Sequence, residues 1–164
     1  MTDSLLAPGG AERAAYLKQV ATGNQPGCRL CGVLAGPDGH QVLMRGEWAT
    51  LIMNKFPYAV GHLMVVLNRH TGDINLKLYE AEAVHLLLAL GCRALDAVYH
   101  PDGYNIGLNV GKAAGQSVVD HLHWHLVPRM ANDVNFITVT ADTRVINETV
   151  AESYAKLKAV VNRV

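Results

Sequence analysis

Short apolar segments separated by turn-forming residues occupy much of the chain, and two stretches show helical spacing instead. The segments rich in β-branched and aliphatic residues predict strands at 42–45, 48–53, 62–67, 104–109, 121–127 and 135–140. Gly46-Glu47 joins the first two strands as a hairpin. A long helix is predicted over 76–99 because these apolar residues recur on one helix face: Leu78, Val84, Leu87, Leu88, Leu95 and Val98. A closing helix is predicted over 147–160.

The predicted strands follow one another through short connections and do not alternate with helices. This order favours an α+β fold, with a mainly antiparallel sheet of about five strands, one long helix and a C-terminal helix, over a doubly wound fold. A chain of 164 residues can bury the core of one domain. Residues 1–26, with helical spacing over 11–22, are expected to form an N-terminal arm, and residues 27–164 the domain.

The charge balance restricts the classes of partner. The 14 basic side chains equal the 14 acidic ones, so the formal net charge is zero. This balance argues against binding to a nucleic-acid polymer and against a polybasic membrane patch. The apolar runs fall far short of the ~20 residues that span a bilayer, and residues 1–10 lack the features of a signal peptide. We therefore expect a cytoplasmic protein with no membrane partner.

Three histidines occupy alternate positions of one predicted strand. With 8 histidines in 164 residues, this arrangement would arise by chance in roughly 2% of chains of this length. Strand side chains alternate, so His121, His123 and His125 share one side while Leu122 and Trp124 face the core. A solvated strand face does not explain three imidazoles. Local chemistry leaves open a catalytic metal site or a histidine nucleophile with its ordinary pKa of ~6.5.

The residues around this row match a known family signature. Gly115-Gln116-Ser117-Val118 precedes the row and Pro128-Arg129 follows it. Together they resemble the histidine triad superfamily of nucleotidyl hydrolases and transferases. Further matches within about 27–157 resemble its bacterial branch of diadenosine polyphosphate hydrolases and phosphorylases: Asn54-Lys55-Phe56-Pro57-Tyr58, Gly61-His62-Leu63 and Asn105-Ile106-Gly107.

This resemblance implies the fold of that superfamily and a two-step mechanism. It makes His123 the nucleophile that attacks the α-phosphorus and forms a nucleotidyl-histidine intermediate. His125 would hydrogen-bond a phosphate oxygen or the leaving group, and His62 would orient the nucleophilic ring. The transferase branch usually has glutamine in place of the third histidine, so His125 favours hydrolysis or phosphorolysis.

The resemblance also implies the substrate contacts. Gln116 and Ser117 would contact phosphate oxygens, helped by backbone N–H groups of the Gly115 loop. Asn54 and Asn109 resemble ribose or phosphate contacts, although an asparagine taken alone is more often a turn or capping residue. Adenine nucleotides are the expected substrates.

A second group of candidates consists of metal ligands. Cys28 and Cys31 have the C-x-x-C spacing with which two thiolates bind one Zn²⁺, or form a redox pair. No thioredoxin-like βαβ pattern surrounds them, which disfavours the redox alternative. Zinc-bearing members of the superfamily complete such a site with two histidines, which implies His70 and His121. Four protein ligands leave no open position for substrate, so a structural zinc is expected.

The sequence thus favours a nucleotidyl hydrolase or phosphorylase that cleaves dinucleoside polyphosphates such as diadenosine tetraphosphate. Three alternatives remain: an adenosine phosphoramidase or adenylyl hydrolase of the same superfamily, a non-catalytic nucleotide-binding protein, and a metal hydrolase that uses the histidine row directly. The loop at Gly115 resembles that of the hydrolases more than the Gly-Ala-Gly run of the nearest bacterial relatives. Family members are commonly homodimers, which is expected here. Trp48 and Phe56 fit the core or base stacking, and the core is favoured.

Overall fold

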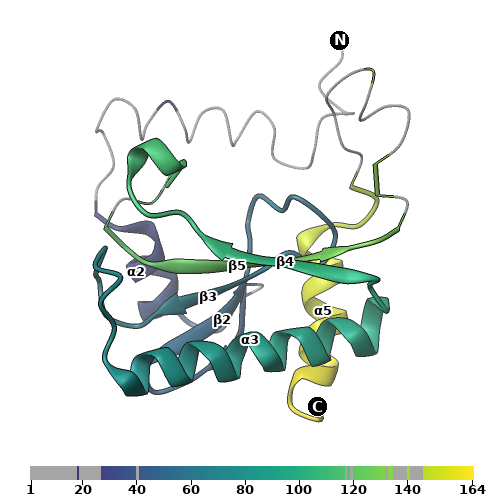
Figure 1. Ribbon diagram of the computed structural model, residues 1–164. Helices are drawn as coiled ribbons and strands as arrows, with labels where there is room; N and C mark the ends of the chain where they lie inside the picture. Colours follow the sequence, from purple (N-terminus) through teal and green to yellow (C-terminus); the bar gives the residue numbers. More distant parts are fainter. Residues whose placement is uncertain are drawn as a thin grey trace.

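Five antiparallel strands form a sheet at the centre of the structure (Figure 1). The computed structural model describes residues 18, 27–39, 41–116, 118, 120–131, 133–134, 140 and 146–164. The strands are β1 (Val42–Arg45), β2 (Ala49–Met53), β3 (Leu63–Leu67), β4 (Gly103–Leu108) and β5 (His123–Arg129). Their order across the sheet is β1-β2-β3-β5-β4, so β5 lies between two strands that precede it in the sequence.

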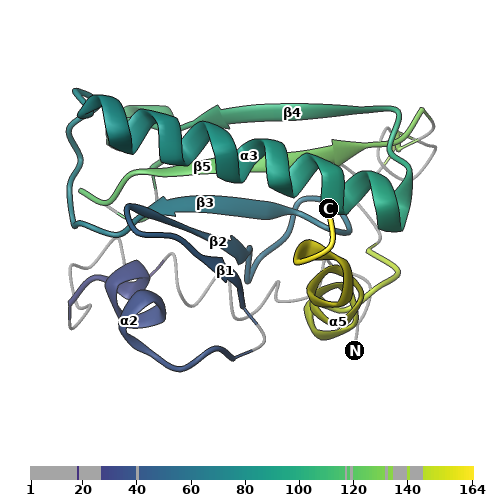
Figure 2. The same cartoon turned by 90° about the horizontal axis from the view of Figure 1, so that it is seen from below.

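Helices cover the two faces of the sheet unequally. Helix α3 (Leu78–Tyr99) runs along one face, and α5 (Val150–Val161) packs against α3 and β1 (Figure 2). The main core lies here, and it takes the odd-numbered residues of β2 and β3: Leu51, Met53, Leu63, Val65 and Leu67. The short helix α2 (Arg29–Ala35) covers part of the opposite face. Its Leu30 packs there against the even-numbered residues Val42, Ile52, Met64 and Val66.

The middle of α3 lies very close to the sheet. Gly91 is buried at this point, and a Cβ atom added to it would lie 2.7 Å from Cδ2 of Leu126. Glycine is unfavourable inside a helix by about 1 kcal/mol relative to alanine. The close approach of α3 to β5 explains why glycine is present here.

The predicted fold class is confirmed, with an antiparallel five-stranded sheet, one long helix and a C-terminal helix. The hairpin is confirmed, and β1 has the predicted bounds. The strands predicted at 48–53 and 62–67 each begin one residue later, and the one predicted at 104–109 is shifted back by one.

The strand that carries the histidines begins two residues later than predicted. It spans His123–Arg129 and not 121–127. Asp120 has a positive φ of 61°, and the N–H of Leu122 donates to the carbonyl of Thr71 at 2.8 Å. This part of the chain is therefore turned and held against the loop after β3. His121 lies before the strand, and only His123 and His125 alternate along it.

The predicted helices also begin too early. Lys77 caps α3, and its N–H donates to the carboxylate of Glu80 at 2.9 Å. Thr149 caps α5, so that helix starts at Val150 and not at residue 147. The predicted helix face included Leu78, but this side chain is 85% exposed and does not share the buried face of α3. Glu80 occupies the buried position of the first turn, and a residue two positions earlier points about 200° away from it.

Other expectations met different outcomes. Helix α2 was not predicted, because seven residues are too few to show helical periodicity. The predicted core position of Trp48 is wrong: it is 39% exposed and packs on Tyr79, with ring centroids 4.4 Å apart. The helical arm over 11–22 lies outside the described residues except for Lys18. The strand over 135–140 also lies outside them, except for Thr140, which is helical. Within the described residues, no helix has the length and apolarity needed to cross a bilayer.

Candidate functional site

A cavity of about 810 Å³, including its open mouth, lies on the face of the sheet that α2 covers. Part of its wall is apolar and comes from α2, β2 and β3: Leu30, Val33, Ile52 and Met64. Another part is polar and comes from β5 and two loops: Asn54, Gly115, His123 and His125. The cavity therefore joins an apolar slot to a pair of imidazoles.

His123 lines this cavity and has a lone pair on one ring nitrogen. Its Nδ1 lies 2.9 Å from the backbone carbonyl oxygen of His121. A carbonyl oxygen only accepts, so Nδ1 carries the ring proton and Nε2 has a lone pair. Burial lowers the pKa of His123 below its usual value, although the bond to the His121 carbonyl opposes this effect. The ring is therefore neutral near pH 7 and nucleophilic at Nε2.

In His125 the proton and the lone pair are on the opposite ring nitrogens from those in His123. The backbone N–H of Tyr58 determines this arrangement through His62. The N–H of Tyr58 donates to Nδ1 of His62 at 3.0 Å, so the proton of neutral His62 is on Nε2. That Nε2 lies 3.0 Å from Nδ1 of His125 and donates to it. His125 must then carry its own proton on Nε2. It offers an N–H donor where His123 offers a lone pair.

The surroundings of His125 keep it uncharged. Burial, and secondarily the neighbouring His123, lower its pKa to about 4. The ring of Tyr58 packs against both His62 and His125, with centroids 4.5 and 5.6 Å away. This aromatic contact and the hydrogen bond from His62 hold the His125 ring in one orientation.

The position of His62 differs from the predicted one. It is fully buried behind His125 and bonds that ring, whereas the resemblance implied that it orients the nucleophilic ring. The group that orients His123 is instead the backbone carbonyl of His121. Sequence patterns do not reveal such a contact, because every residue has a carbonyl group.

Asn54 lines the cavity and also forms a turn. Its Oδ1 accepts from the N–H of Phe56 at 2.9 Å, and its Nδ2 lies 3.3 Å from the ring nitrogens of His62. The local turn role that an isolated asparagine often has is therefore present. The same residue remains at the wall of the cavity, next to the imidazole pair.

The other predicted substrate contacts have different positions. Gly115 lines the cavity, and Gln116 beside it is buried, with its Oε1 accepting from the N–H of Gly111 at 2.9 Å. The Nε2 of Gln116 has no hydrogen-bond partner among the described residues. Asn109 does not line the cavity. Ser117 lies outside the described residues.

Several cavity residues were missed by sequence reasoning. Arg29, Lys55 and Tyr58 line the cavity, and so does Phe56, whose predicted core position is wrong. For Lys55, Phe56 and Tyr58, one indication was present in the sequence: they belong to the segment starting at Asn54 that resembles the family. Arg29 gave no signal, because α2 was not predicted.

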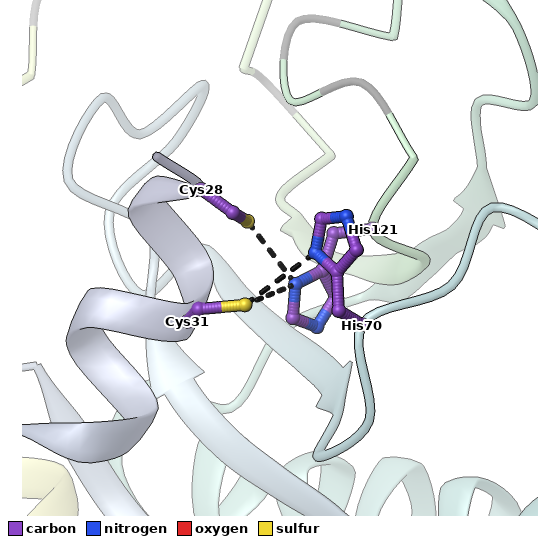
Figure 3. A group of neighbouring side chains, drawn as sticks. All are labelled: Cys28, Cys31, His70 and His121. Atoms are coloured by element: carbon purple, nitrogen blue, oxygen red, sulfur yellow. Dashed lines mark hydrogen bonds between the residues drawn. The ribbon is translucent and has the colours of Figure 1, made fainter. Parts of the chain in front are cut away.

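The four predicted metal ligands come together between α2, the loop after β3 and the start of β5 (Figure 3). The ligand atoms of Cys28, Cys31, His70 and His121 all lie within 4.8 Å of one another. Nδ1 of His121 is 3.2 Å from the sulfur of Cys28 and 3.5 Å from that of Cys31. Nδ1 of His70 is 3.4 Å from the Cys31 sulfur. In a tetrahedral zinc site, ordinary bond lengths separate sulfur and nitrogen ligands by about 3.6 Å.

The chemistry of these groups also fits a cation. His121 is fully buried, and its Nε2 donates to the carbonyl of Leu67 at 2.7 Å, which leaves the Nδ1 lone pair facing the thiols. Burial, followed by the adjacent Cys28, raises the pKa of the Cys31 thiol, so two thiolates side by side require a positive partner. Sequence and structure therefore agree on a Cys2His2 group suited to zinc.

The metal group and the cavity share one residue. The ring of His121 faces the two sulfurs, while its backbone carbonyl orients His123. The loop that carries His70 is held against α3, because the neighbouring Arg69 binds the buried carboxylate of Glu80 on that helix. This arrangement, with Arg69 as the first cause, lowers the pKa of Glu80 to about 2. Movement at the ligand group would therefore disturb the nucleophile candidate.

Comparisons with known proteins agree with this geometry. Residues 38–132 match the family model of the HIT domain. An AP-4-A phosphorylase from Mycobacterium tuberculosis is 39% identical over 107 residues, which cover 64% of this chain and 54% of that protein. An uncharacterized HIT-like protein from Saccharolobus solfataricus is 32% identical over 108 residues, covering 65% and 76%. A Zn-bound histidine triad family protein from Mycobacterium smegmatis aligns with a TM-score of 0.68 at 27% identity, covering 83% and 94%. This chain thus spans about half the length of the phosphorylase.

Proposed function

Because this chain belongs to the HIT domain family, we propose that it is a nucleotidyl hydrolase or phosphorylase that cleaves dinucleoside polyphosphates such as diadenosine tetraphosphate. The observation that carries the proposal is the pair of opposite tautomers in the cavity. His123 has a lone pair that can attack phosphorus, and His125 has an N–H that can donate to a departing oxygen. The similarity to an AP-4-A phosphorylase supports the substrate class.

The first step uses the lone pair of His123 Nε2. It forms a bond to the α-phosphorus, the bond from phosphorus to the bridging oxygen breaks, and the leaving nucleotide takes that electron pair. The ring then carries a positive charge, which is stabilised because Nδ1–H still donates to the His121 carbonyl. In the second step, water or inorganic phosphate attacks phosphorus and loses any excess proton to solvent. The P–N bond breaks, and Nε2 regains its lone pair.

His125 acts on the leaving group in this scheme. Negative charge develops on the bridging oxygen as its bond to phosphorus breaks, and the N–H of His125 can donate to that oxygen. The bond from His62 keeps this N–H in place, because Nδ1 of His125 already accepts from His62. A pKa of about 4 also means that His125 is uncharged when substrate arrives near pH 7.

The cavity offers separate places for base, sugar and phosphate. The slot formed by Leu30, Val33 and Ile52 suits an adenine base, and Asn54 at its polar end suits the ribose hydroxyls. The Gly115 loop suits the phosphates, and the buried Nε2 of Gln116 is a donor there with no partner among the described residues. The phosphate contact of Ser117 stays a prediction from the family resemblance, and Asn109 has no part in this scheme.

A substrate panel tests the reaction. The protein is incubated with diadenosine tetraphosphate, diadenosine triphosphate and adenosine phosphoramidate, with and without inorganic phosphate, and the products are identified by mass. Monophosphate formed without phosphate indicates hydrolysis, and diphosphate formed only with phosphate indicates phosphorolysis. Turnover of the phosphoramidate alone would assign a phosphoramidase. Binding without any turnover would refute the enzymatic proposal.

The covalent step has its own test. His123→Ala is expected to lower kcat by at least about 10³-fold, because no other group replaces the nucleophile. His85→Ala is the matched control, since His85 is exposed on α3, on the opposite face of the sheet from the cavity. Acid-free quenching of the wild-type protein should reveal a nucleotidyl adduct by mass, and His123→Ala should lack it. A variant that retains turnover would exclude His123 as nucleophile.

We also propose a structural zinc ion held by Cys28, Cys31, His70 and His121. The four-ligand group and the Zn-bound relative from Mycobacterium smegmatis support it. Elemental analysis should find one zinc per chain, and Cys31→Ser should lose it together with thermal stability. Cys92→Ser is the control, because Cys92 lies within α3. Metal-free protein with an unchanged melting temperature would contradict this proposal.

The proposed assembly is a homodimer. Strand β4 lies at the edge of the sheet, and its Ile106 is 51% exposed, so a second copy can extend the sheet at this edge. Light scattering measures the mass in solution, and Ile106→Lys should shift it toward the monomer. A monomeric wild-type protein at micromolar concentration would contradict the dimer.

A further inference from the structure

The two cysteines of the metal group lie close enough to react with each other. Cys28 and Cys31 have the spacing found in thiol–disulfide pairs, and their sulfurs belong to the group whose ligand atoms all lie within 4.8 Å of one another. Figure 3 shows both thiols pointing from the start of α2 toward the ring of His121. A disulfide between these sulfurs would replace their bonds to a metal ion.

A second cavity reaches Cys31 along another face of α2. It measures about 660 Å³, including its open mouth, and Cys31, Leu34 and Ala35 form its helical wall. The nucleotide cavity takes Leu30 and Val33 from α2 instead, and the two cavities share no lining residue. Both cysteines of the metal group are partly exposed. A small oxidant can therefore reach Cys31 while a nucleotide occupies the first cavity.

His121 connects the two sulfurs to the nucleophile candidate. Its Nδ1 faces the sulfurs, its Nε2 donates to the carbonyl of Leu67, and its own carbonyl accepts from Nδ1 of His123 at 2.9 Å. A disulfide neither binds zinc nor donates a proton, so it would leave the Nδ1 lone pair of this fully buried ring without a partner. An unsatisfied buried acceptor is costly, and movement of the ring toward water relieves that cost. Such movement would also shift the carbonyl that orients His123.

We propose that Cys28 and Cys31 form a redox switch for the nucleophile: hydrogen peroxide converts them to a disulfide, the zinc ion is released, and His123 loses its fixed orientation. This inference rests on the proposed zinc ion and on the proposed function, because it adds regulation of the same site. The pair differs from a dithiol catalyst, since it passes no electrons to a nucleotide.

The proposed step is a two-electron oxidation. The Cys31 thiolate attacks one oxygen of hydrogen peroxide, the O–O bond breaks, and hydroxide leaves with that electron pair, so a sulfenic acid forms. The Cys28 thiolate then attacks the oxidised sulfur and displaces a second hydroxide, which makes the S–S bond. Both hydroxide ions take protons from solvent and become water. The sulfurs lose two electrons and the peroxide gains them, while zinc stays Zn²⁺.

The test starts from the reduced, zinc-bound protein. Hydrogen peroxide is added in steps, with and without saturating AMP, while a chromogenic chelator measures released zinc and mass spectrometry follows the chain. We expect one zinc ion released per chain, a chain lighter by two hydrogen atoms, and the same course with AMP. For diadenosine tetraphosphate, kcat/KM should fall about ten- to hundredfold, because small displacements of a catalytic group have effects of this size. Dithiothreitol and zinc together should restore it.

Two variants assign the disulfide. Cys92→Ser retains only the C-x-x-C pair, and it should behave like the wild type. Cys28→His keeps four metal ligands but has one thiolate in the group, so its chain should gain oxygen and should not lose two hydrogen atoms. If Cys28→His holds no zinc, the mass and zinc release of Cys92→Ser still decide the proposal.

Nitrogen NMR of the imidazole rings reports on His123 without any turnover. In the zinc-bound protein, Nδ1 of His123 should carry the proton, because it donates to the His121 carbonyl. Oxidation should replace this single state by a mixture of the two tautomers, and dithiothreitol with zinc should restore it.

The outcomes separate the switch from the proposed function. Failure of the wild-type protein to cleave any nucleotide refutes the proposed function, and the NMR signal then still tests the switch. Zinc that stays bound while peroxide oxidises Cys92 overturns the switch, and so does zinc release that leaves the His123 signal unchanged. Protection by AMP, or sulfinic acid in place of a disulfide, overturns it as well. Wild-type protein without zinc refutes both the zinc proposal and the switch.

Discussion

Replacement of His62 by phenylalanine should separate the two halves of the proposed mechanism. His62 does not line the cavity, yet its Nε2–H determines which nitrogen of His125 carries a proton. Phenylalanine fills a similar volume and has neither donor nor acceptor. Without the bond from His62, His125 can move its proton to Nδ1 and lose the donor that faces the leaving group.

The magnitude follows from the burial of this bond. His62 is fully buried, and both of its nitrogens are engaged at 3.0 Å. A hydrogen bond that meets developing charge contributes about 1.5 to 3 kcal/mol. That energy corresponds to roughly a ten- to hundredfold loss of kcat. The N–H of Tyr58 also loses its acceptor, which should lower the free energy of unfolding by about 1 to 3 kcal/mol.

The assay varies the leaving group. Adenosine phosphoramidate releases an amine that must gain a proton, whereas the p-nitrophenyl ester of AMP releases a phenolate that needs none. His62→Phe should therefore slow the first reaction much more than the second, while His123→Ala should abolish both. His62→Gln, which again offers an acceptor and a donor, should recover most of the activity. Equal losses on both substrates for His62→Phe would refute the assignment of His125 as the leaving-group donor.

Three further predictions concern stability. Gly91→Ala should destabilise the fold by about 1 to 3 kcal/mol in denaturant titration, because the new Cβ would lie 2.7 Å from Leu126 Cδ2; an unchanged midpoint would contradict the close packing of α3. Thr149→Ala should cost about 1 kcal/mol through loss of the α5 cap, with kcat unchanged. The pKa of His125 falls from 6.5 in the unfolded chain to about 4 in the folded protein. Between pH 6.5 and pH 4, only the unfolded chain therefore binds a proton at His125. The free energy of unfolding must then decrease as the pH drops from 6.5 to 4. Relative to His125→Asn, the wild type should lose on the order of 1 to 2 kcal/mol more between pH 7 and 4, allowing for partial solvent access, and parallel pH curves would contradict the shift.

The sequence was most informative where chemistry depends on residue type and short spacing. The C-x-x-C pair and the alternate histidines were visible without coordinates, and the structure brings all four predicted metal ligands within 4.8 Å. The hairpin and the long helix were equally clear, because their periodicity is local. Boundaries were less accurate, because caps such as Lys77 and turns such as Asp120 depend on side chains and backbone angles outside the repeating pattern.

Only the tertiary structure could decide how the histidines differ. The alternating pattern alone presents His121, His123 and His125 as equivalent members of one row, and the different roles given to them came from the family resemblance. In the fold, His121 faces two thiols, His123 donates to a carbonyl and His125 accepts from a distant histidine. Hydrogen-bond partners determine which nitrogen is protonated, and these partners come from parts of the chain as much as 93 residues away.

The same distinction applies to the whole protein. Residue types and periodicities by themselves determined the α+β class, the histidine row and the C-x-x-C pair, because each depends on neighbours in the chain. The choice of His123 as nucleophile and of His70 and His121 as zinc ligands came from the family resemblance. Packing of α2 against the sheet brought Arg29 to the cavity, and packing of β3 beside β5 placed His62 behind His125. These contacts join distant segments, and their energies depend on a geometry that exists only after the chain has folded.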